Sequence, residues 1–122
     1  MKCTIETLEN PNFFHLRLSC SSSLPLEKGL IEEICEIIIV QDKPLVLIDV
    51  SNLSADTTIA DDFYDASKLA RKLRGRVHRL AILETKRRKK FVDFFETVAK
   101  NRGLNISAFF DEAKAVAWLK EN

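Results

Sequence analysis

A continuous apolar run after Pro44 constrains the fold more than any other feature of the chain. Residues 45–50 read Leu-Val-Leu-Ile-Asp-Val, without the alternation of apolar and polar side chains that a strand with one solvated face has. Such a run is typical of a central strand that other elements cover on both faces. We therefore expect a sheet with helices against its two sides.

The first twenty residues predict a β-hairpin. Segments 3–9 and 13–20 alternate apolar and polar side chains, and Asn10-Pro11-Asn12 between them favours a turn. The positions of Cys3 and Cys20 place them opposite each other on the two strands, where we expect packed thiols and no redox pair.

Helices and further strands alternate along the rest of the chain. Leu26, Leu30, Ile34 and Ile38 recur at helical spacing and predict a first helix, with Ser23 as its N-cap. The same criteria predict a helix over 59–73, a strand over 77–83, a helix from 91 that Gly103 ends, a strand over 106–110, and a closing helix after Asp111. The order β-β-α-β-α-β-α-β-α predicts an α/β fold with a mixed sheet flanked by helices.

Length and composition predict one domain over residues 1–122. Of the 122 residues, 46% are apolar and 30% charged, which is far from the balance of a disordered chain. Apolar runs such as Ile37 to Val40 are too short to cross a bilayer, and the polar alternating start leads us to expect no signal peptide. Three cysteines without Cys-x-x-Cys spacing suit a reducing compartment, so we expect a cytoplasmic protein.

The closing residues carry a resemblance to a known family. Residues 110–119 read Phe-Asp-Glu-Ala-Lys-Ala-Val-Ala-Trp-Leu, which is similar to the ending of the SpoIIAA-like group of small bacterial STAS-related proteins. The element order, with an acid near the end of the central strand and a helix-opening loop after it, also resembles the STAS fold of anti-sigma-factor antagonists. This resemblance implies a SpoIIAA-like fold over nearly the whole chain.

The resemblance also implies a regulatory role. Antagonists of this family are regulated at a serine in an Asp-Ser-Ser-Gly motif, and Asp56-Thr57-Thr58-Ile59 is its nearest match here, with Thr for both Ser and Ile for Gly. The implied switch residues are Ser54, Thr57 and Thr58; the alternative is that Thr58 only caps a helix. The implied partner-facing loop comprises Asp49, Ser51, Asn52, Asp56, Asp61 and Asp62.

Charge is segregated although the net charge is +1. Segment 27–65 holds ten acids and two bases, whereas segment 71–90 holds ten bases and one acid. The two segments can neutralise each other within one chain or meet in a homodimer. The sharpest basic run is Lys86-Arg87-Arg88-Lys89-Lys90, which is either an anion site for phosphate or nucleic acid or a solvated basic face.

The residue types that catalysis needs do not gather in the sequence. Asp49 stands near the carboxyl end of a central strand, where it is either catalytic or, as we favour, a cap for the backbone N–H groups of the Val50-Ser51-Asn52 turn. His15 and His78 have no second ligand at metal spacing, so we treat both as structural and expect no metal site. Three scattered glycines also argue against a nucleotide-binding loop, and we expect no cofactor.

These observations favour a non-enzymatic cytoplasmic regulatory module that binds a protein partner, such as an anti-sigma-factor-like kinase or another regulator. One alternative is a carrier of a small apolar or anionic ligand. Another is phosphate or nucleic-acid binding through residues 86–90.

Overall fold

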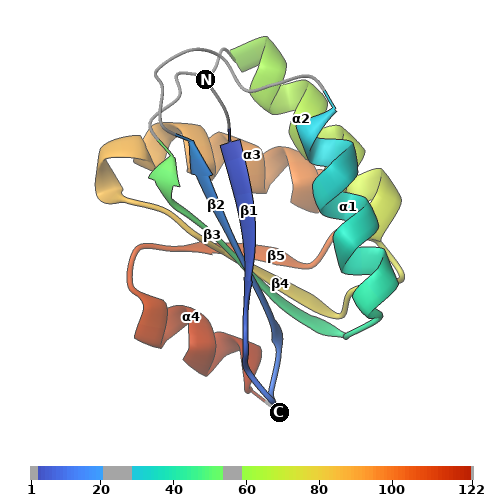
Figure 1. Ribbon diagram of the computed structural model, residues 1–122. Helices are drawn as coiled ribbons and strands as arrows, with labels where there is room; N and C mark the ends of the chain where they lie inside the picture. Colours follow the sequence, from blue (N-terminus) through green and yellow to red (C-terminus); the bar gives the residue numbers. More distant parts are fainter. Residues whose placement is uncertain (1–2, 21–28, 54–58, 122) are drawn as a thin grey trace.

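The computed structural model describes residues 3–20, 29–53 and 59–121 (Figure 1). The elements are β1 (Cys3–Leu8), β2 (Phe14–Cys20), α1 (Leu30–Gln41), β3 (Leu45–Leu53), α2 (Ile59–Leu73), β4 (Arg79–Leu83), the 3₁₀ turn η1 (Lys86–Arg88), α3 (Lys89–Asn101), β5 (Ile106–Phe109) and α4 (Glu112–Leu119). Apart from η1, this is the predicted order. The predicted start of the first helix, before residue 29, lies outside the described residues. None of the helices in the described ranges is long and apolar enough to cross a lipid bilayer.

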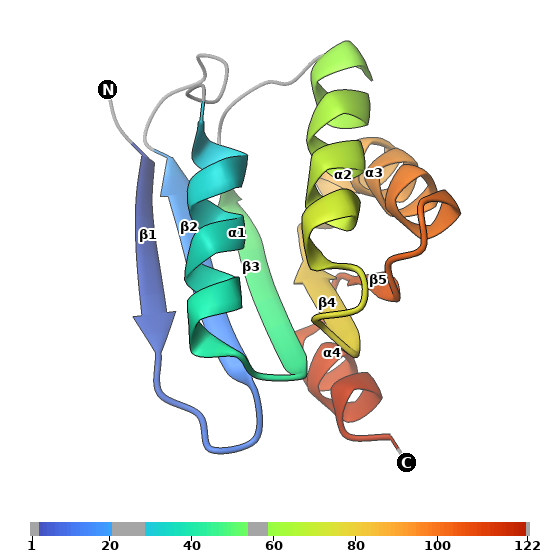
Figure 2. The ribbon, with the colours of Figure 1, turned by 90° about the vertical axis from the view of Figure 1, so that its right-hand side faces the viewer.

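The five strands form one mixed sheet in the order β1-β2-β3-β4-β5. The β1–β2 pair is the predicted antiparallel hairpin, and every later pair is parallel. Helices α1, α2 and α3 cover one face of the sheet, and α4 packs alone on the opposite face (Figures 1 and 2). The parallel crossovers explain why the central strands are buried on both sides.

The apolar run of β3 serves two cores, as its sequence predicts. Val46 and Ile48 belong to the larger core with α1, α2 and α3, whereas Leu47 belongs to the smaller core with Leu119 of α4. Leu47 is fully buried, and so is Val46 on the other face. Because successive side chains of a strand point to opposite faces, a half-polar β3 would leave one of these cores incomplete.

One expectation about the hairpin is wrong. Cys3 lies opposite Cys20 as predicted, but the two residues form a disulfide where packed thiols were expected. Their Cα atoms are 4.1 Å apart across the strand pair, which brings the sulfurs together without moving the backbone. The cysteines therefore no longer support the argument for a reducing compartment. Cys35 is a free, buried thiol.

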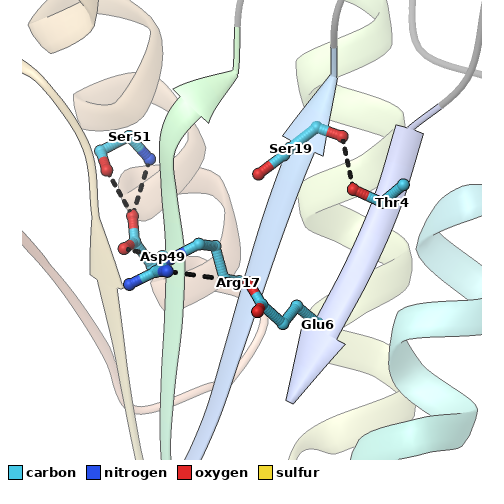
Figure 3. A network of polar contacts seen from close by, with 6 residues as sticks. All are labelled: Thr4, Glu6, Arg17, Ser19, Asp49 and Ser51. Carbon is cyan, nitrogen blue, oxygen red and sulfur yellow. Dashed lines mark hydrogen bonds and ion pairs between the residues drawn. The ribbon is translucent and has the colours of Figure 1, made fainter. Parts of the chain in front are cut away.

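Strand β3 is longer than predicted and contains a bulge. Arg17 of β2 pairs with Asp49, but Ser19 pairs with Asn52, so β3 carries one extra residue between these two positions. The expected turn at residues 50–52 is therefore part of the strand, which continues to Leu53. Ser51 lies two residues after Asp49, and the two side chains meet (Figure 3).

Candidate functional site

A cavity of about 630 Å³ lies between the sheet and helices α1, α2 and α3, at the carboxyl ends of β3 and β4. Ligands of open α/β sheets bind at this edge, because parallel strands all end there and the loops that follow can shape a site. We call this space the carboxyl-edge cavity. It is lined mainly by aliphatic and aromatic side chains, among them Ile48, Val50 and Ile82 from the strands and Ile34, Leu69 and Phe95 from the helices.

The polar part of the cavity wall centres on Glu84, which directly follows β4. Its side chain is 3% exposed and lies beside that of Arg88, whose Nε donates a hydrogen bond to Glu84 Oε2 at 2.9 Å. The backbone N–H of Thr85 donates to Oε1 at 2.8 Å. Burial raises the pKa of Glu84 above its usual value, although Thr85 and Arg88 act in the opposite direction.

The helix side of the cavity carries further acids. Glu32 of α1, together with Asp61 and Asp65 of α2, lines the cavity. Lys68 Nζ donates to Glu32 Oε2 at 2.7 Å, and this hydrogen bond lowers the pKa of Glu32. The Lys68 ammonium also lies 4.8 Å from the ring centroid of Tyr64, which is exposed. This side of the cavity is therefore acidic overall, with one lysine reaching across from α2 to α1.

Asp49 lies on the other face of the sheet, away from the carboxyl-edge cavity. It accepts hydrogen bonds at Oδ1 from the Ser51 backbone N–H and hydroxyl, at 2.9 and 2.5 Å, and at Oδ2 from Arg17 Nε at 3.3 Å. Arg17 also pairs with Glu6 at 3.7 Å, and Figure 3 shows these side chains in one row across β1, β2 and β3. The favoured interpretation of Asp49 as a local backbone acceptor agrees with the Ser51 contact.

The predicted partner-facing loop is divided by the structure. Asp49 and Ser51 face the α4 side of the sheet, whereas Asp61 lines the cavity on the opposite side. Asn52 is exposed in β3. The remaining predicted residues, Ser54, Asp56, Thr57 and Thr58, and the side chain of Asp62 lie outside what the structure describes.

The basic run also divides. Arg88 turns inward to Glu84, and its guanidinium carbon lies 5.4 Å from the centroid of the Phe91 ring. Lys86, Arg87 and Lys90 are exposed, and Lys89 pairs with Asp93 one turn further along α3. The inward position of Arg88 separates it from the other cations of the run. Anion binding by residues 86–90 stays a prediction.

Sequence reasoning missed the carboxyl-edge cavity and its acid. The one available signal was Glu84 itself, a lone acid at the end of an apolar strand with Arg88 four residues later. That spacing permits an ion pair within one helical turn. The cavity walls, in contrast, come from segments far apart in the chain, and no local pattern marks them.

Comparison with solved structures defines the fold. The chain matches an anti-sigma factor antagonist from Mycobacterium paratuberculosis with a TM-score of 0.68 and 9% identity, over 98% of this chain and 96% of that chain. It matches an uncharacterized protein from Shewanella loihica, described as having a SpoIIAA-like fold, with a TM-score of 0.59 and 19% identity, over 96% and 93%. No protein-family model and no curated protein matches the chain. The chain therefore shares their fold, an α/β sheet flanked by helices. Its fold is SpoIIAA-like, as the element order and the closing residues predict.

Proposed function

We propose that this protein is a non-enzymatic binding module that holds a small apolar molecule in the carboxyl-edge cavity. The cavity itself is the observation that carries the proposal. Its volume of about 630 Å³ falls within the range of about 300–1,000 Å³ that small-molecule sites use. Apolar walls with a few buried polar groups are the usual composition of such sites, because the walls supply affinity and the polar groups fix orientation.

The charges around the cavity favour a neutral or cationic head group on that ligand. Four acids line the cavity, Glu32, Asp61, Asp65 and Glu84, and in the described part of the chain they face two bases, Arg88 in the lining and Lys68 paired with Glu32. An anionic ligand would add a like charge in a poorly hydrated space, where repulsion is strong. Of the two ligand types considered from the sequence, the apolar one therefore fits better than the anionic one.

The experiment compares a neutral and an anionic fluorescent probe of similar shape. We expect N-phenylnaphthylamine to bind one site per chain and anilinonaphthalene sulfonate to bind more weakly. Val50→Trp fills the strand wall of the cavity with a larger ring, so it should weaken the neutral probe by about tenfold or more, which is about 1.4 kcal/mol. Val40→Trp is the matched control, because Val40 is 79% exposed on α1 and does not line the cavity. Equal binding by both variants would refute the cavity as the site.

A second candidate function is the binding of a protein partner at the start of α2. Phe63 and Tyr64 are 45% and 56% exposed there, beside the exposed Asp61. A cation already lies 4.8 Å from the centroid of each ring, Arg102 over Phe63 and Lys68 over Tyr64. Exposed aromatic rings beside an acid suit a partner surface rich in Arg and Lys. The likeness to an anti-sigma factor antagonist agrees with a regulatory partner, such as a kinase of the anti-sigma-factor type.

Native mass spectrometry of the protein gently isolated from its host separates the two candidates. A retained small molecule, lost in Val50→Trp, supports the first. A stoichiometric protein partner that Tyr64→Ser releases and Val40→Ser retains supports the second. The same spectra report a homodimer and any phosphate on Ser54, Thr57 or Thr58.

A further inference from the structure

Three side chains with metal-ligating atoms meet on the face of the sheet that carries α4. His15 comes from β2, Asp49 from β3 and Glu112 from the first turn of α4, and one ligating atom of each lies within 4.8 Å of the others. His15 pairs with Leu47 across the parallel strands, so Asp49, two residues further along β3, lies on the same face. The cluster is on the opposite side of the sheet from the carboxyl-edge cavity.

His15 provides an observation that is independent of the two acids. His15 is only 7% exposed, and its buried Nε2 has no hydrogen-bond partner within the described ranges. A buried nitrogen without a hydrogen-bond partner is unfavourable, so such a group in a folded protein needs an explanation. The Phe13 ring, with its centroid 5.9 Å from that of the imidazole, restricts where His15 can point.

Asp49 is already oriented by its neighbours, as ligands in metal sites are. Oδ1 accepts from the Ser51 N–H and hydroxyl, and Oδ2 accepts from Arg17. Hydrogen bonds of this kind fix the direction of a ligating carboxylate. Arg17 also pairs with Glu6, so its positive charge is shared between Glu6 and Asp49.

We propose that His15, Asp49 and Glu112 bind a divalent first-row transition metal ion, with Zn²⁺ as the best fit. One imidazole nitrogen and two carboxylate oxygens match the ligands that Zn²⁺ takes, and three protein ligands leave a further position for water or another small ligand. The imidazole disfavours Ca²⁺ and Mg²⁺, which prefer oxygen ligands throughout. Glu112 is exposed at the start of α4, so its side chain can turn to bring its oxygen to the ion. The ion would tie α4 to β2 and β3.

This site was not expected from the sequence, because metal motifs are recognised by short spacings between ligands. His15, Asp49 and Glu112 lie on three separate elements, and only the parallel pairing of β2 with β3 and the return of α4 across the sheet unite them. The carboxylate of Glu112 also had an ordinary explanation, since acids are common in the first turn of a helix.

The test titrates the metal-free protein with Zn²⁺ in a calorimeter. We expect one ion per chain, and Glu112→Gln should weaken binding by about tenfold or more, since it removes one charged ligand. Glu112 is exposed, so this variant should fold normally. The matched control is Glu121→Gln, because Glu121 is an exposed acid just beyond the other end of α4.

A second pair of variants separates the proposed site from adventitious binding at surface histidines. His15→Gln should lose binding, whereas His78→Gln should keep it, because His78 is exposed and outside the cluster. At the same Zn²⁺ concentration, the thermal midpoint should also rise less for Glu112→Gln than for the wild-type protein, since an ion that binds only the folded state stabilises it according to its affinity. No binding by the wild-type protein, or equal binding by Glu112→Gln, would overturn the proposal.

Discussion

Glu84 shows how a single buried acid can set the chemistry of a cavity. Its carboxylate is removed from water, which raises its pKa, and the hydrogen bonds from Thr85 and Arg88 do not fully compensate. The loss of hydration therefore outweighs the ion pair, as is common for buried pairs. A ligand group that donates a hydrogen bond to this carboxylate would recover part of that cost, which agrees with the neutral or cationic head group proposed above.

The raised pKa of Glu84 gives a pH dependence of stability with a definite sign. The folded state holds the proton more tightly than the unfolded state, whose carboxyl has the usual value of 4.5. Stability from this group is therefore fully present below pH 4.5 and is lost as pH rises through the higher folded-state pKa. In urea unfolding, the free energy of wild type minus that of Glu84→Gln should fall as pH rises above 4.5. A difference that stays constant or rises would contradict this.

At the level of single residues, the sequence predicts neighbours well only where the intervening chain is short. The Cys3–Cys20 pairing follows from one hairpin and its turn. The oxidation state did not follow, because it depends on the redox conditions around the protein as well as on the register. The contacts of Glu84 with Arg88 lie within one helical turn and were open to prediction, whereas the meeting of His15 with Glu112 was not.

Among the elements, β1 depends on a single neighbouring strand. It lies at one edge of the sheet and pairs with β2 alone. The Cys3–Cys20 disulfide closes the open end of this hairpin, opposite the turn at Asn10, whose side chain accepts a hydrogen bond from the Asn12 N–H. The disulfide therefore holds an edge strand whose hydrogen bonds satisfy only one side.

Removing this disulfide should destabilise the protein. The bond joins residues separated by 17 positions, and by loop-closure entropy its loss should lower the free energy of unfolding by about 3 kcal/mol. Cys3→Ser should therefore unfold at a lower denaturant concentration than wild type under non-reducing conditions, and excess dithiothreitol should reduce the gap. The intact mass of protein from its own host should be lower than that of the reduced chain by two hydrogens. A fully reduced chain in that sample would contradict the disulfide and favour the original expectation of a reducing compartment.

The control for this experiment measures the reactivity of the free thiol of Cys35. Burial raises the pKa of its thiol to about 11, so the folded protein should expose almost no thiolate at neutral pH. A thiol reagent should therefore find no fast-reacting group in the native oxidised protein and one after unfolding. Cys35→Ala removes that signal and leaves the disulfide intact.

The predicted elements differ from the structure mainly at their ends. The helix expected from Phe91 begins instead at Lys89, after the 3₁₀ turn Lys86–Arg88. The inward Arg88 and the backbone contact of Thr85 with Glu84 accompany this tighter turn, and neither leaves a periodic signal. The bulge in β3 is likewise invisible in the sequence, because an apolar run looks the same with or without one extra residue.

For the whole molecule, the sequence predicted the layers but not the space between them. The two-sided burial of β3 follows from its composition, and the sheet with helices on both faces follows from the element order. The carboxyl-edge cavity depends on how far α1, α2 and α3 stand from the strands, which is set by packing among all of them. No local sequence pattern predicts that separation or the balance of charges in the cavity lining.

The two cores share β3 and β4, so we expect them to unfold together. Leu119 of α4 is 1% exposed in the smaller core, and Leu119→Ala should destabilise the protein by about 2–5 kcal/mol through the cavity it leaves. Trp118, the one tryptophan of the sequence, packs against this smaller core, and its fluorescence reports that face. Far-ultraviolet circular dichroism reports all the helices, three of which lie on the other face.

In urea, the fluorescence and dichroism transitions should coincide for wild type and shift together in Leu119→Ala, because the central strands cannot lose one core and keep their hydrophobic contacts on the other side. Glu121→Gln, a change at an exposed position just beyond α4, should leave both transitions in place. If the fluorescence transition of Leu119→Ala came first, α4 would be a separately melting layer. The proposed metal site at Glu112 would then have to be tested as the element that holds α4 to the sheet.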